Sequence, residues 1–302
     1  MNGLTMKHLR YFEALARLGH FGRAAESCSI SQPALSVQIR ELEDLVGAPL
    51  VERGGRSIRL TGLGEEFAGR TRAILRAVDD LEELGRAAHG PLAGRLRLGV
   101  IPTVAPYLLP GVIKALTRQY PDLDLRPREA ITQRLIGDLA EARLDVAIVA
   151  LPVSEPVLGE MPLFSEEFML VRPLDEAHKP VPAANRLHEM RLLLLEEGHC
   201  FRDQALSVCN IDATATRALM EGSSLTTLVQ MVGAGIGVTL IPQMAVDIET
   251  RSSPVCVFRL AEPRPTRTIG MVWRKTNPLA AQFAEIGGII RQVAEAASLG
   301  QA

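Results

Sequence analysis

The feature that most limits the possible folds is an alternation of strand-like and helix-like segments that begins near residue 95. Apolar segments over 95–101, 123–129 and 145–150 predict strands, and helical periodicity over 106–120 and 132–142 predicts helices between them. In a second group the expected elements are strands over 166–171, 192–195 and 237–241 and a helix over 223–232. A strand over 268–273 and a helix over 278–296 are expected to return to the first group. This order predicts an α/β fold with a mainly parallel sheet.

The N-terminal residues show a different pattern, which predicts helices joined by a tight turn. Thr5 can cap a helix over 5–18, and a short helix over 22–28 follows. Ser31 can cap the next helix, whose apolar side chains recur at helical spacing up to Val46. Such a pair of helices is typical of a helix-turn-helix, in which the second helix lies in the major groove of DNA.

Three polar side chains occupy the start of that second helix, where contacts to bases fall: Ser31, Gln32 and Ser36. Residues 51–61 predict a β-ribbon around two glycines, with Arg53 and Arg56 suited to phosphates or the minor groove. The pattern alone leaves a generic helical hairpin with a polar face as the alternative.

A long helical pattern over 62–88 follows the ribbon. Phe67, Ile74 and Leu81 repeat at seven-residue intervals within it, which predicts pairing between the helices of two chains. The composition Gly-Pro-Leu-Ala-Gly over 90–94 predicts a hinge before the α/β region.

The composition limits the class of protein. A net charge of −2 means that any DNA-binding signal must be local. The chain lacks an apolar stretch of the roughly 20 residues that a membrane span needs, and residues 1–10 lack the pattern of a secretory signal. We therefore expect no membrane contact and a location in a reducing cytoplasm. Four cysteines do not form a disulfide framework, so an oxidisable pair would be a redox device.

The segment 196–209 contains the candidate redox pair, Cys200 and Cys209. His199 and Arg202 flank Cys200, and basic neighbours favour the thiolate, which is the nucleophile. Nine residues span about 13 Å in a helix and about 30 Å when extended, whereas a disulfide tolerates at most ~7 Å between Cα atoms. The two cysteines therefore cannot bond while the segment is regular, and oxidation would have to refold it.

Spacing alone leaves two structural cysteines as the alternative, and Cys28 and Cys256 are expected to be small core residues. No metal site or cofactor is predicted, because no Cys-x-x-Cys or paired histidine spacing accompanies the candidate pair.

Several runs of the N-terminal region resemble the winged helix-turn-helix of LysR-type transcription regulators. They are Ala-Ala-Glu at 24–26, Ser-Gln-Pro-Ala-Leu-Ser at 31–36, Ile-Arg-Glu-Leu-Glu at 39–43, Gly-Ala-Pro-Leu at 47–50, Glu-Arg at 52–53 and Leu-Thr-Gly-Leu-Gly at 60–64. The resemblance implies DNA contacts by Gln32, Pro33, Ser36 and Arg53. With the candidates from the pattern, the full predicted DNA-contacting set is Ser31, Gln32, Pro33, Ser36, Gln38, Arg53 and Arg56. Val37 stands where the wider family often has arginine.

The sensor segment resembles that of the peroxide-responsive branch of this family. The matching runs are Gly-His-Cys at 198–200, Arg-Asp-Gln-Ala at 202–205, Cys209, the stretches 100–104 and 106–110, and Thr-Ile-Gly at 268–270. The resemblance implies that Cys200 is the peroxidatic and Cys209 the resolving cysteine. It also implies a polar surround for the peroxide, formed by Thr103, Thr132, His199, Arg202 and Asp203.

The patterns and the family resemblance together predict the domain organisation. A winged helix-turn-helix occupies 1–62, a linker and dimerisation helix 63–89 and a hinge 90–94. A two-lobed α/β effector domain similar to a periplasmic binding protein follows, with lobe I over 95–165 and 266–302 and lobe II over 166–265. The implied partners are promoter DNA, further copies of the chain as a dimer or tetramer, RNA polymerase, hydrogen peroxide as signal, and glutaredoxin or thioredoxin as reductant.

Two other functions remain open at this point. A LysR-type regulator could instead respond to a small inducer between the lobes, without needing Cys200. A thiol peroxidase could use the same two cysteines, but it would have no use for a DNA-reading head, so we predict a regulator and not an enzyme.

Overall fold

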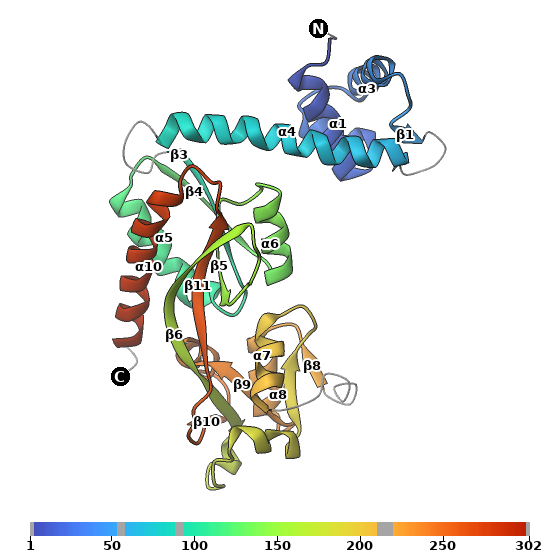
Figure 1. Cartoon of the computed structure of the whole chain (residues 1–302). Coiled ribbons are helices and arrows are strands. Elements are labelled where there is room, and N and C mark those ends of the chain that lie inside the picture. The colour runs from blue at the N-terminus through green and yellow to red at the C-terminus, as the bar shows by residue number, and fades with distance from the viewer. Residues whose placement is uncertain (1–2, 53–57, 88–93, 210–219, 300–302) are drawn as a thin grey trace. The chain divides into compact units, whose positions relative to one another are not determined.

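The computed structural model describes residues 3–52, 58–87, 94–209 and 220–299 (Figure 1). The chain divides into two compact units, Met1–Gly85 and Arg86–Ala302. The first unit has one hydrophobic core and the second has two.

The first unit is built on three short helices whose ends are fixed by local hydrogen bonds. Helix α1 (Met6–Leu18) starts at a capping box, in which Thr5 Oγ1 accepts from the N–H of His8 and His8 Nδ1 accepts from the N–H of Thr5. The other two are α2 (Phe21–Ser27) and α3 (Gln32–Val46). The predicted helix-turn-helix is confirmed, and its fully buried side chains include Phe12, Leu15, Leu35, Ile39 and Leu42.

A two-stranded ribbon follows α3, with β1 (Val51–Glu52) antiparallel to β2 (Arg59–Leu60). The predicted turn of this ribbon, with Arg53 and Arg56, lies outside the described residues. Glu43 on α3 fixes the ribbon, because its Oε1 accepts from the N–H groups of Leu50 and Val51.

Helix α4 (Gly62–Ala87) starts against this ribbon. A Cβ atom on Gly64 would meet the carbonyl oxygen of Leu50, so only glycine allows this approach. Phe67 packs edge-to-face on Phe12, with ring centroids 5.4 Å apart. Ile74 and Leu81, the next residues of the predicted heptad, are exposed in the single chain.

The second unit contains one sheet in two halves, and in each half three strands run parallel. In the first half they are β3 (Gly94–Val100), β4 (Leu123–Glu129) and β5 (Val146–Leu151). In the second half they are β7 (Leu192–Leu195), β8 (Met220–Gly222) and β9 (Val238–Pro242). Gly94, the last residue of the predicted hinge, starts β3, and the rest of that hinge lies outside the described residues.

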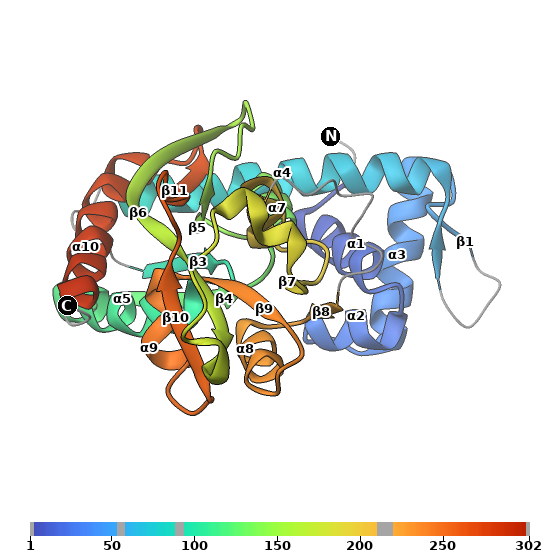
Figure 2. The ribbon, with the colours of Figure 1, turned by 90° about the horizontal axis from the view of Figure 1, so that it is seen from below.

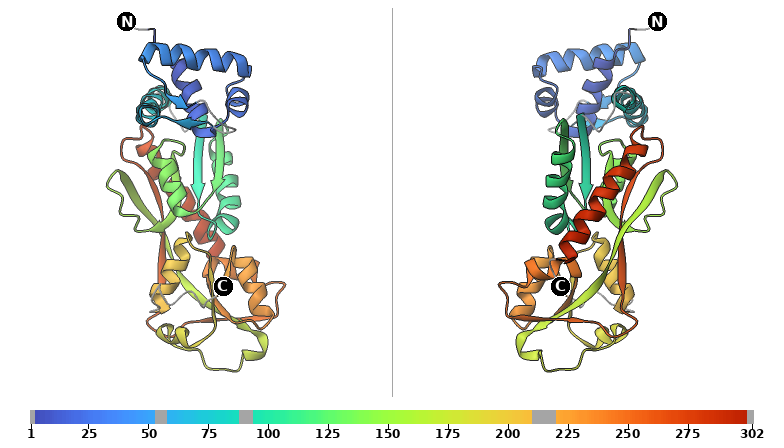
Figure 3. Two further views of the ribbon diagram at one scale, coloured as in Figure 1. Left: turned by 90° about the vertical axis from the view of Figure 1, so that its right-hand side faces the viewer. Right: turned by 90° about the vertical axis from the view of Figure 1, so that its left-hand side faces the viewer.

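Two long strands join the halves (Figure 3). Strands β6 (Leu158–Pro173) and β11 (Thr266–Arg274) pair antiparallel with each other, β11 pairs antiparallel with β5, and β6 with β9 and with β10 (Val255–Arg259). The expectation of a mainly parallel sheet is therefore wrong. The chain passes from one half to the other and back along neighbouring strands, which need no crossover helix.

Each half surrounds its own core, and the two halves are named lobe I and lobe II after these cores. Lobe I has α5 (Ala105–Gln119) and α10 (Ala280–Leu299) side by side on one face of its strands and α6 (Thr132–Ala140) on the other (Figures 1 and 2). The helices of lobe II are α7 (Cys200–Cys209), α8 (Leu225–Gly233) and α9 (Val246–Glu249). The predicted two-lobed α/β architecture is confirmed.

The predicted boundary between residues 165 and 166 coincides with no break in the structure, because β6 is continuous across it. Among the described residues, none of the helices combines the length and apolar character that a membrane span requires.

Candidate functional site

Helix α7 carries the two candidate redox cysteines at its ends. Cys200 is its first residue and Cys209 its last, and both are free thiols. Cys200 packs against the lobe I core, whereas Cys209 is fully buried within the lobe II core. At ~1.5 Å of rise per residue, their Cα atoms lie about 13 Å apart, beyond the ~7 Å that a disulfide tolerates. A disulfide between them therefore requires α7 to open.

Cys200 lines a narrow, tightly packed cavity between the two lobes, which leaves no room for a water molecule in this conformation. The loop after β3, the start of α6 and the start of α7 meet there, and the lining residues are Ile101, Pro102, Thr103, Ile131, Thr132, His199, Cys200 and Phe201. Thr132 Oγ1 is buried in this region without a hydrogen-bond partner among the described residues. A buried hydroxyl without a partner costs free energy, so binding of a small polar guest becomes favourable once the cavity opens enough to admit it.

A buried arginine orients the Thr103 hydroxyl. Arg267 Nη1 donates to Thr103 Oγ1 at 2.8 Å, and Arg267 Nη2 donates to the Thr103 carbonyl at 3.0 Å. A guanidinium has no acceptor atom, so the hydroxyl proton of Thr103 stays available to a guest in the cavity.

Arg267 is held in turn by lobe-spanning contacts. Glu166 Oε1 lies 2.8 Å from Arg267 Nη2, and Glu166 Oε2 accepts from the N–H of Met244 at 3.0 Å. The guanidinium lies over the ring of Phe201, 5.0 Å from its centroid. Since Phe201 follows Cys200, this network fixes the first turn of α7 as well as Thr103.

His199 contributes a neutral ring to the cavity. Burial lowers the pKa of His199 below its usual value, and the carboxylates of Glu196 and Glu129 offset only part of that effect. At neutral pH the imidazole can therefore exchange hydrogen bonds with a guest but adds no positive charge beside Cys200.

The structure does not bring Arg202 or Asp203 to the cavity, although the family resemblance placed both there. Arg202 Nη1 donates to the carbonyl of Leu195 at 2.8 Å and to Glu221 Oε1 at 2.6 Å, so its charge anchors α7 to β7 and β8. Asp203 is exposed. The charge of Arg202 is thus directed away from Cys200, and the positive charge that remains on this side of the cavity is the Arg267 guanidinium at Thr103 and Phe201.

Cys209 is in an unreactive state at the other end of the helix. Burial raises the pKa of its thiol to about 12, so the thiol keeps its proton at neutral pH. Cys209 can therefore react with Cys200 only after it has left the lobe II core.

Five of the DNA-contacting candidates lie at the cap of α3 or in its first half. Gln32 and Pro33 are exposed and Ser36 is half-buried. The Ser31 hydroxyl accepts from the N–H of Ala34 and so serves as the helix cap. Gln38 Nε2 donates to Glu41 Oε2 at 2.6 Å. The last two candidates, Arg53 and Arg56, lie outside the described residues.

Comparison with known families assigns both units. Residues 6–65 match the bacterial regulatory helix-turn-helix proteins of the lysR family. Residues 89–295 match the LysR substrate binding domain. The chain belongs to the LysR family. This LysR-family chain is 42% identical to a probable hydrogen peroxide-inducible genes activator of Streptomyces viridosporus, covering 95% of this chain and 94% of that one. It is 39% identical to the DNA-binding transcriptional dual regulator OxyR of Escherichia coli K12, with 95% of each chain covered.

Solved structures of OxyR proteins are also similar. A full-length OxyR from Pseudomonas aeruginosa with a Cys-to-Asp substitution is 37% identical, covers 95% of this LysR-family chain and 97% of its own, and has a TM-score of 0.74. A Cys-to-Ser mutant of Corynebacterium glutamicum OxyR with bound H2O2 is 34% identical over 97% and 93% of the two chains, with a TM-score of 0.66. The resemblance to peroxide-responsive LysR-type regulators is confirmed.

Sequence reasoning missed Arg267 and Glu166, which connect the cavity of this LysR-family chain to both lobes. The available signal was their position, because the two opposite charges lie at the two points where the chain was predicted to pass between lobes. Charged residues inside strands that continue into apolar stretches are expected to be paired when buried.

Proposed function

We propose that this chain regulates transcription from promoter DNA and senses hydrogen peroxide through a reversible disulfide between Cys200 and Cys209. The observation that carries the proposal is the position of Cys200, which begins a helix in a cavity that also holds the hydroxyls of Thr103 and Thr132. The relatives of the chain include a probable hydrogen peroxide-inducible genes activator, and the similar solved structures include an OxyR mutant with H2O2 bound. These relatives support peroxide as the signal.

The first chemical step oxidises Cys200. Its thiolate attacks one oxygen of the peroxide, an S–O bond forms and the O–O bond breaks, and the second oxygen leaves as hydroxide that takes up a proton to give water. Thr103 can donate a hydrogen bond to the departing oxygen, since Arg267 occupies its acceptor side. Thr132 and the neutral ring of His199 can hold the rest of the peroxide. The product is a sulfenic acid on Cys200.

The second step forms the disulfide. The sulfur of Cys209 attacks the sulfenic sulfur of Cys200, an S–S bond forms, and the hydroxyl leaves with the Cys209 proton as water. Because α7 holds the two sulfurs apart, this step needs the helix to open and Cys209 to leave the lobe II core. Loss of this buried residue repacks lobe II, which provides the conformational signal.

The DNA-binding part of the proposal places the start of α3 in the major groove and the ribbon residues Arg53 and Arg56 on the backbone. Dimers or tetramers of the chain would bind promoters of oxidative-stress genes and contact RNA polymerase. Reduction by a dithiol protein such as glutaredoxin or thioredoxin would restore both thiols.

The decisive experiment exposes the purified full-length chain to hydrogen peroxide, blocks the remaining thiols by alkylation and identifies the peptides by mass spectrometry. We expect a Cys200–Cys209 link in the wild type. The Cys209→Ser variant should stop at a sulfenic acid on Cys200, and the Cys200→Ser variant should show neither product.

A matched control is Cys256→Ser, which removes a cysteine of β10 that donates to the backbone carbonyls of Arg172 and Pro173 in β6. This variant should form the disulfide like the wild type. The proposal is wrong if all thiols remain reduced after peroxide treatment. It is also wrong if Cys200→Ser keeps the peroxide response of a target promoter.

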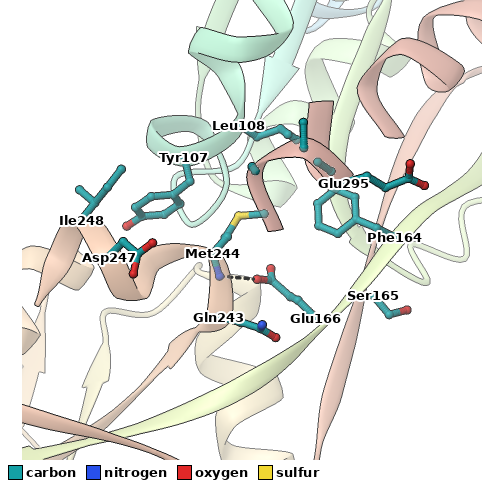
Figure 4. A pocket seen from close by; sticks show the side chains of 13 residues that line it. Tyr107, Leu108, Phe164, Ser165, Glu166, Gln243, Met244, Asp247, Ile248 and Glu295 are labelled. Atoms are coloured by element: carbon teal, nitrogen blue, oxygen red, sulfur yellow. Dashed lines mark hydrogen bonds between the residues drawn. The ribbon is translucent and has the colours of Figure 1, made fainter. Parts of the chain in front are cut away.

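A second candidate function, response to a small inducer, is favoured by a larger cavity of about 740 Å³ in the same unit (Figure 4). Its apolar walls include Leu108, Phe164, Met244 and Ile248. The charged side chains in its lining are all carboxylates, namely Glu166, Asp247 and Glu295. An apolar cavity with acidic groups favours a cation with an apolar body. It shares no lining residue with the Cys200 cavity.

Calorimetry on the Cys200→Ser, Cys209→Ser double variant tests this second function. Benzylammonium, benzyl alcohol and benzoate have the same ring and differ in charge. We expect only the cation to bind, and Asp247→Asn should weaken it while leaving peroxide sensing in the otherwise wild-type chain unchanged. Equal binding of all three probes, or of none, would reject a cationic inducer at this cavity.

A further inference from the structure

Helix α3, the helix proposed to enter the major groove, carries an exposed apolar side chain, Val37, that lies outside the described hydrophobic core of its unit. Leu35, Ile39 and Leu42 form the buried stripe of α3. At ~100° per residue, Val37 lies on the face directly opposite that stripe. Its side chain is 48% exposed.

A valine at this position does nothing for the helix itself. A β-branched side chain loses rotamer freedom in a helix, which costs free energy. At a solvent-facing position no burial of apolar surface offsets this cost. The neighbours on this face that are also exposed and apolar are Pro33 and Ala34, one turn earlier. Together the three residues make a small apolar strip at the N-terminal end of α3, where a recognition helix meets base edges.

The surroundings of this strip are polar. Gln32 and Ser36 lie beside it, and Arg40 follows one turn later. The strip is therefore an apolar contact framed by hydrogen-bonding side chains.

The only apolar group that a base pair presents in the major groove is the C5-methyl of thymine. Valine has no donor or acceptor in its side chain, so the methyl group is the one base feature that it can distinguish. We propose that Val37 is a specificity-determining residue that reads a thymine methyl in each half-site of the operator. This inference rests on the DNA-binding function proposed above.

The test removes the proposed contact between Val37 and the thymine methyl, once by changing the DNA and once by changing the protein. The operator is first selected with the full-length chain from random duplexes, and each thymine is then replaced in turn by deoxyuridine, which lacks only the methyl. Anisotropy titrations at fixed salt should find one thymine per half-site whose replacement weakens wild-type binding by about four-fold, the factor for burial of one methyl group. Val37→Ala should weaken binding to the thymine operator by a similar factor and should be insensitive to deoxyuridine at that position.

Leu45→Ala is the matched control, because Leu45 is an exposed apolar residue at the other end of α3. It should keep the full sensitivity to deoxyuridine. A selected operator at which no deoxyuridine weakens wild-type binding, or a Val37→Ala variant that keeps the sensitivity, overturns the inference and leaves the regulatory function intact. Failure of the selection to enrich any sequence would overturn both.

Discussion

At the residue scale, Arg267 connects the surroundings of Cys200 to both lobes. It lies within the two-lobed unit, almost fully buried, and its donors are distributed between Thr103 in lobe I and Glu166 on the crossing strand β6. A buried pair of this kind is stabilising only while both partners are present, because either charge alone is left without solvent.

We therefore expect Arg267→Met to destabilise the effector unit by about 3–5 kcal/mol, since it leaves the Glu166 carboxylate buried and unpaired. Urea unfolding followed by circular dichroism measures the change. The double variant Arg267→Met, Glu166→Gln should recover part of the loss. Equal stability of the single and double variants would show that the ion pair is unimportant.

The raised pKa of Cys209 has a consequence for stability at high pH. Its thiol titrates near the usual 9.0 in the unfolded chain but only at about 12 in the folded chain. The contribution of the protonated thiol to stability is thus complete below pH 9.0 and is lost as the pH rises toward 12.

The wild type should therefore lose about 1.4 kcal/mol more stability than Cys209→Ala between pH 8 and pH 10, from one unit of unfolded-state titration. Denaturant titrations of both proteins at the two pH values give this difference, and the constant cost of the cavity in the alanine variant cancels. Parallel pH profiles would show that Cys209 is not buried in solution.

At the element scale, the stability of α7 sets the rate at which the two cysteines can meet. The helix keeps Cys200 and Cys209 on opposite cores, so the step from sulfenic acid to disulfide waits for its opening. The exposed residue Ser207 allows this stability to be changed without touching either core.

We expect Ser207→Gly to form the disulfide about five-fold faster than Ser207→Ala, because glycine and alanine differ by about 1 kcal/mol in helix propensity. Acid quenching at intervals after peroxide addition, followed by mass spectrometry, separates this step from sulfenate formation. Identical rates would mean that α7 is already open when Cys209 attacks.

The sequence predicts elements well where the apolar residues follow one regular spacing, and poorly where glycine and proline interrupt that spacing. The strand over 192–195 and the helices around 5–18 and 62–88 have unbroken patterns and were located to within a few residues. The first half of β6 was missed, because Gly159 and Pro162 weaken its strand pattern. Pro162 is accommodated opposite Gly270, where the pairing with β11 shifts register.

The site was less predictable than the fold. The family resemblance placed His199, Arg202 and Asp203 around the peroxide beside Cys200, but successive helical side chains point in different directions. Arg202 was thereby directed to Glu221, and the charge nearest to Thr103 comes instead from Arg267, which follows Cys200 by many residues in the sequence. Only the folded sheet reveals that neighbour.

At the scale of the whole molecule, one side of α4 exposes apolar side chains that the single chain does not cover. Ile74 and Leu81 are 44% and 69% exposed, although they continue the heptad that starts at the packed Phe67. Apolar residues at this spacing are stabilised when a second helix covers them.

We expect the double variant Ile74→Glu, Leu81→Glu to shift the chain from an oligomer toward the monomer while keeping its helix content. Sedimentation velocity across a concentration series measures the assembly, and circular dichroism checks the fold. Arg70→Ala, which removes an exposed ion pair with Glu66 on the same helix, is the control and should assemble normally. An unchanged sedimentation coefficient would place the self-association elsewhere.

The route of the chain through β6 and β11 has a further consequence. Lobe II is one continuous excursion, which leaves lobe I along β6 and returns along its antiparallel neighbour β11, with Glu167 opposite Thr266 at the exit. A whole sensor cassette could therefore be transplanted between related regulators through two adjacent joints, without rerouting lobe I. Such a transplanted lobe II would keep the Glu166–Arg267 pair at its base and would sense peroxide only beside a lobe I that supplies Thr103 and Thr132.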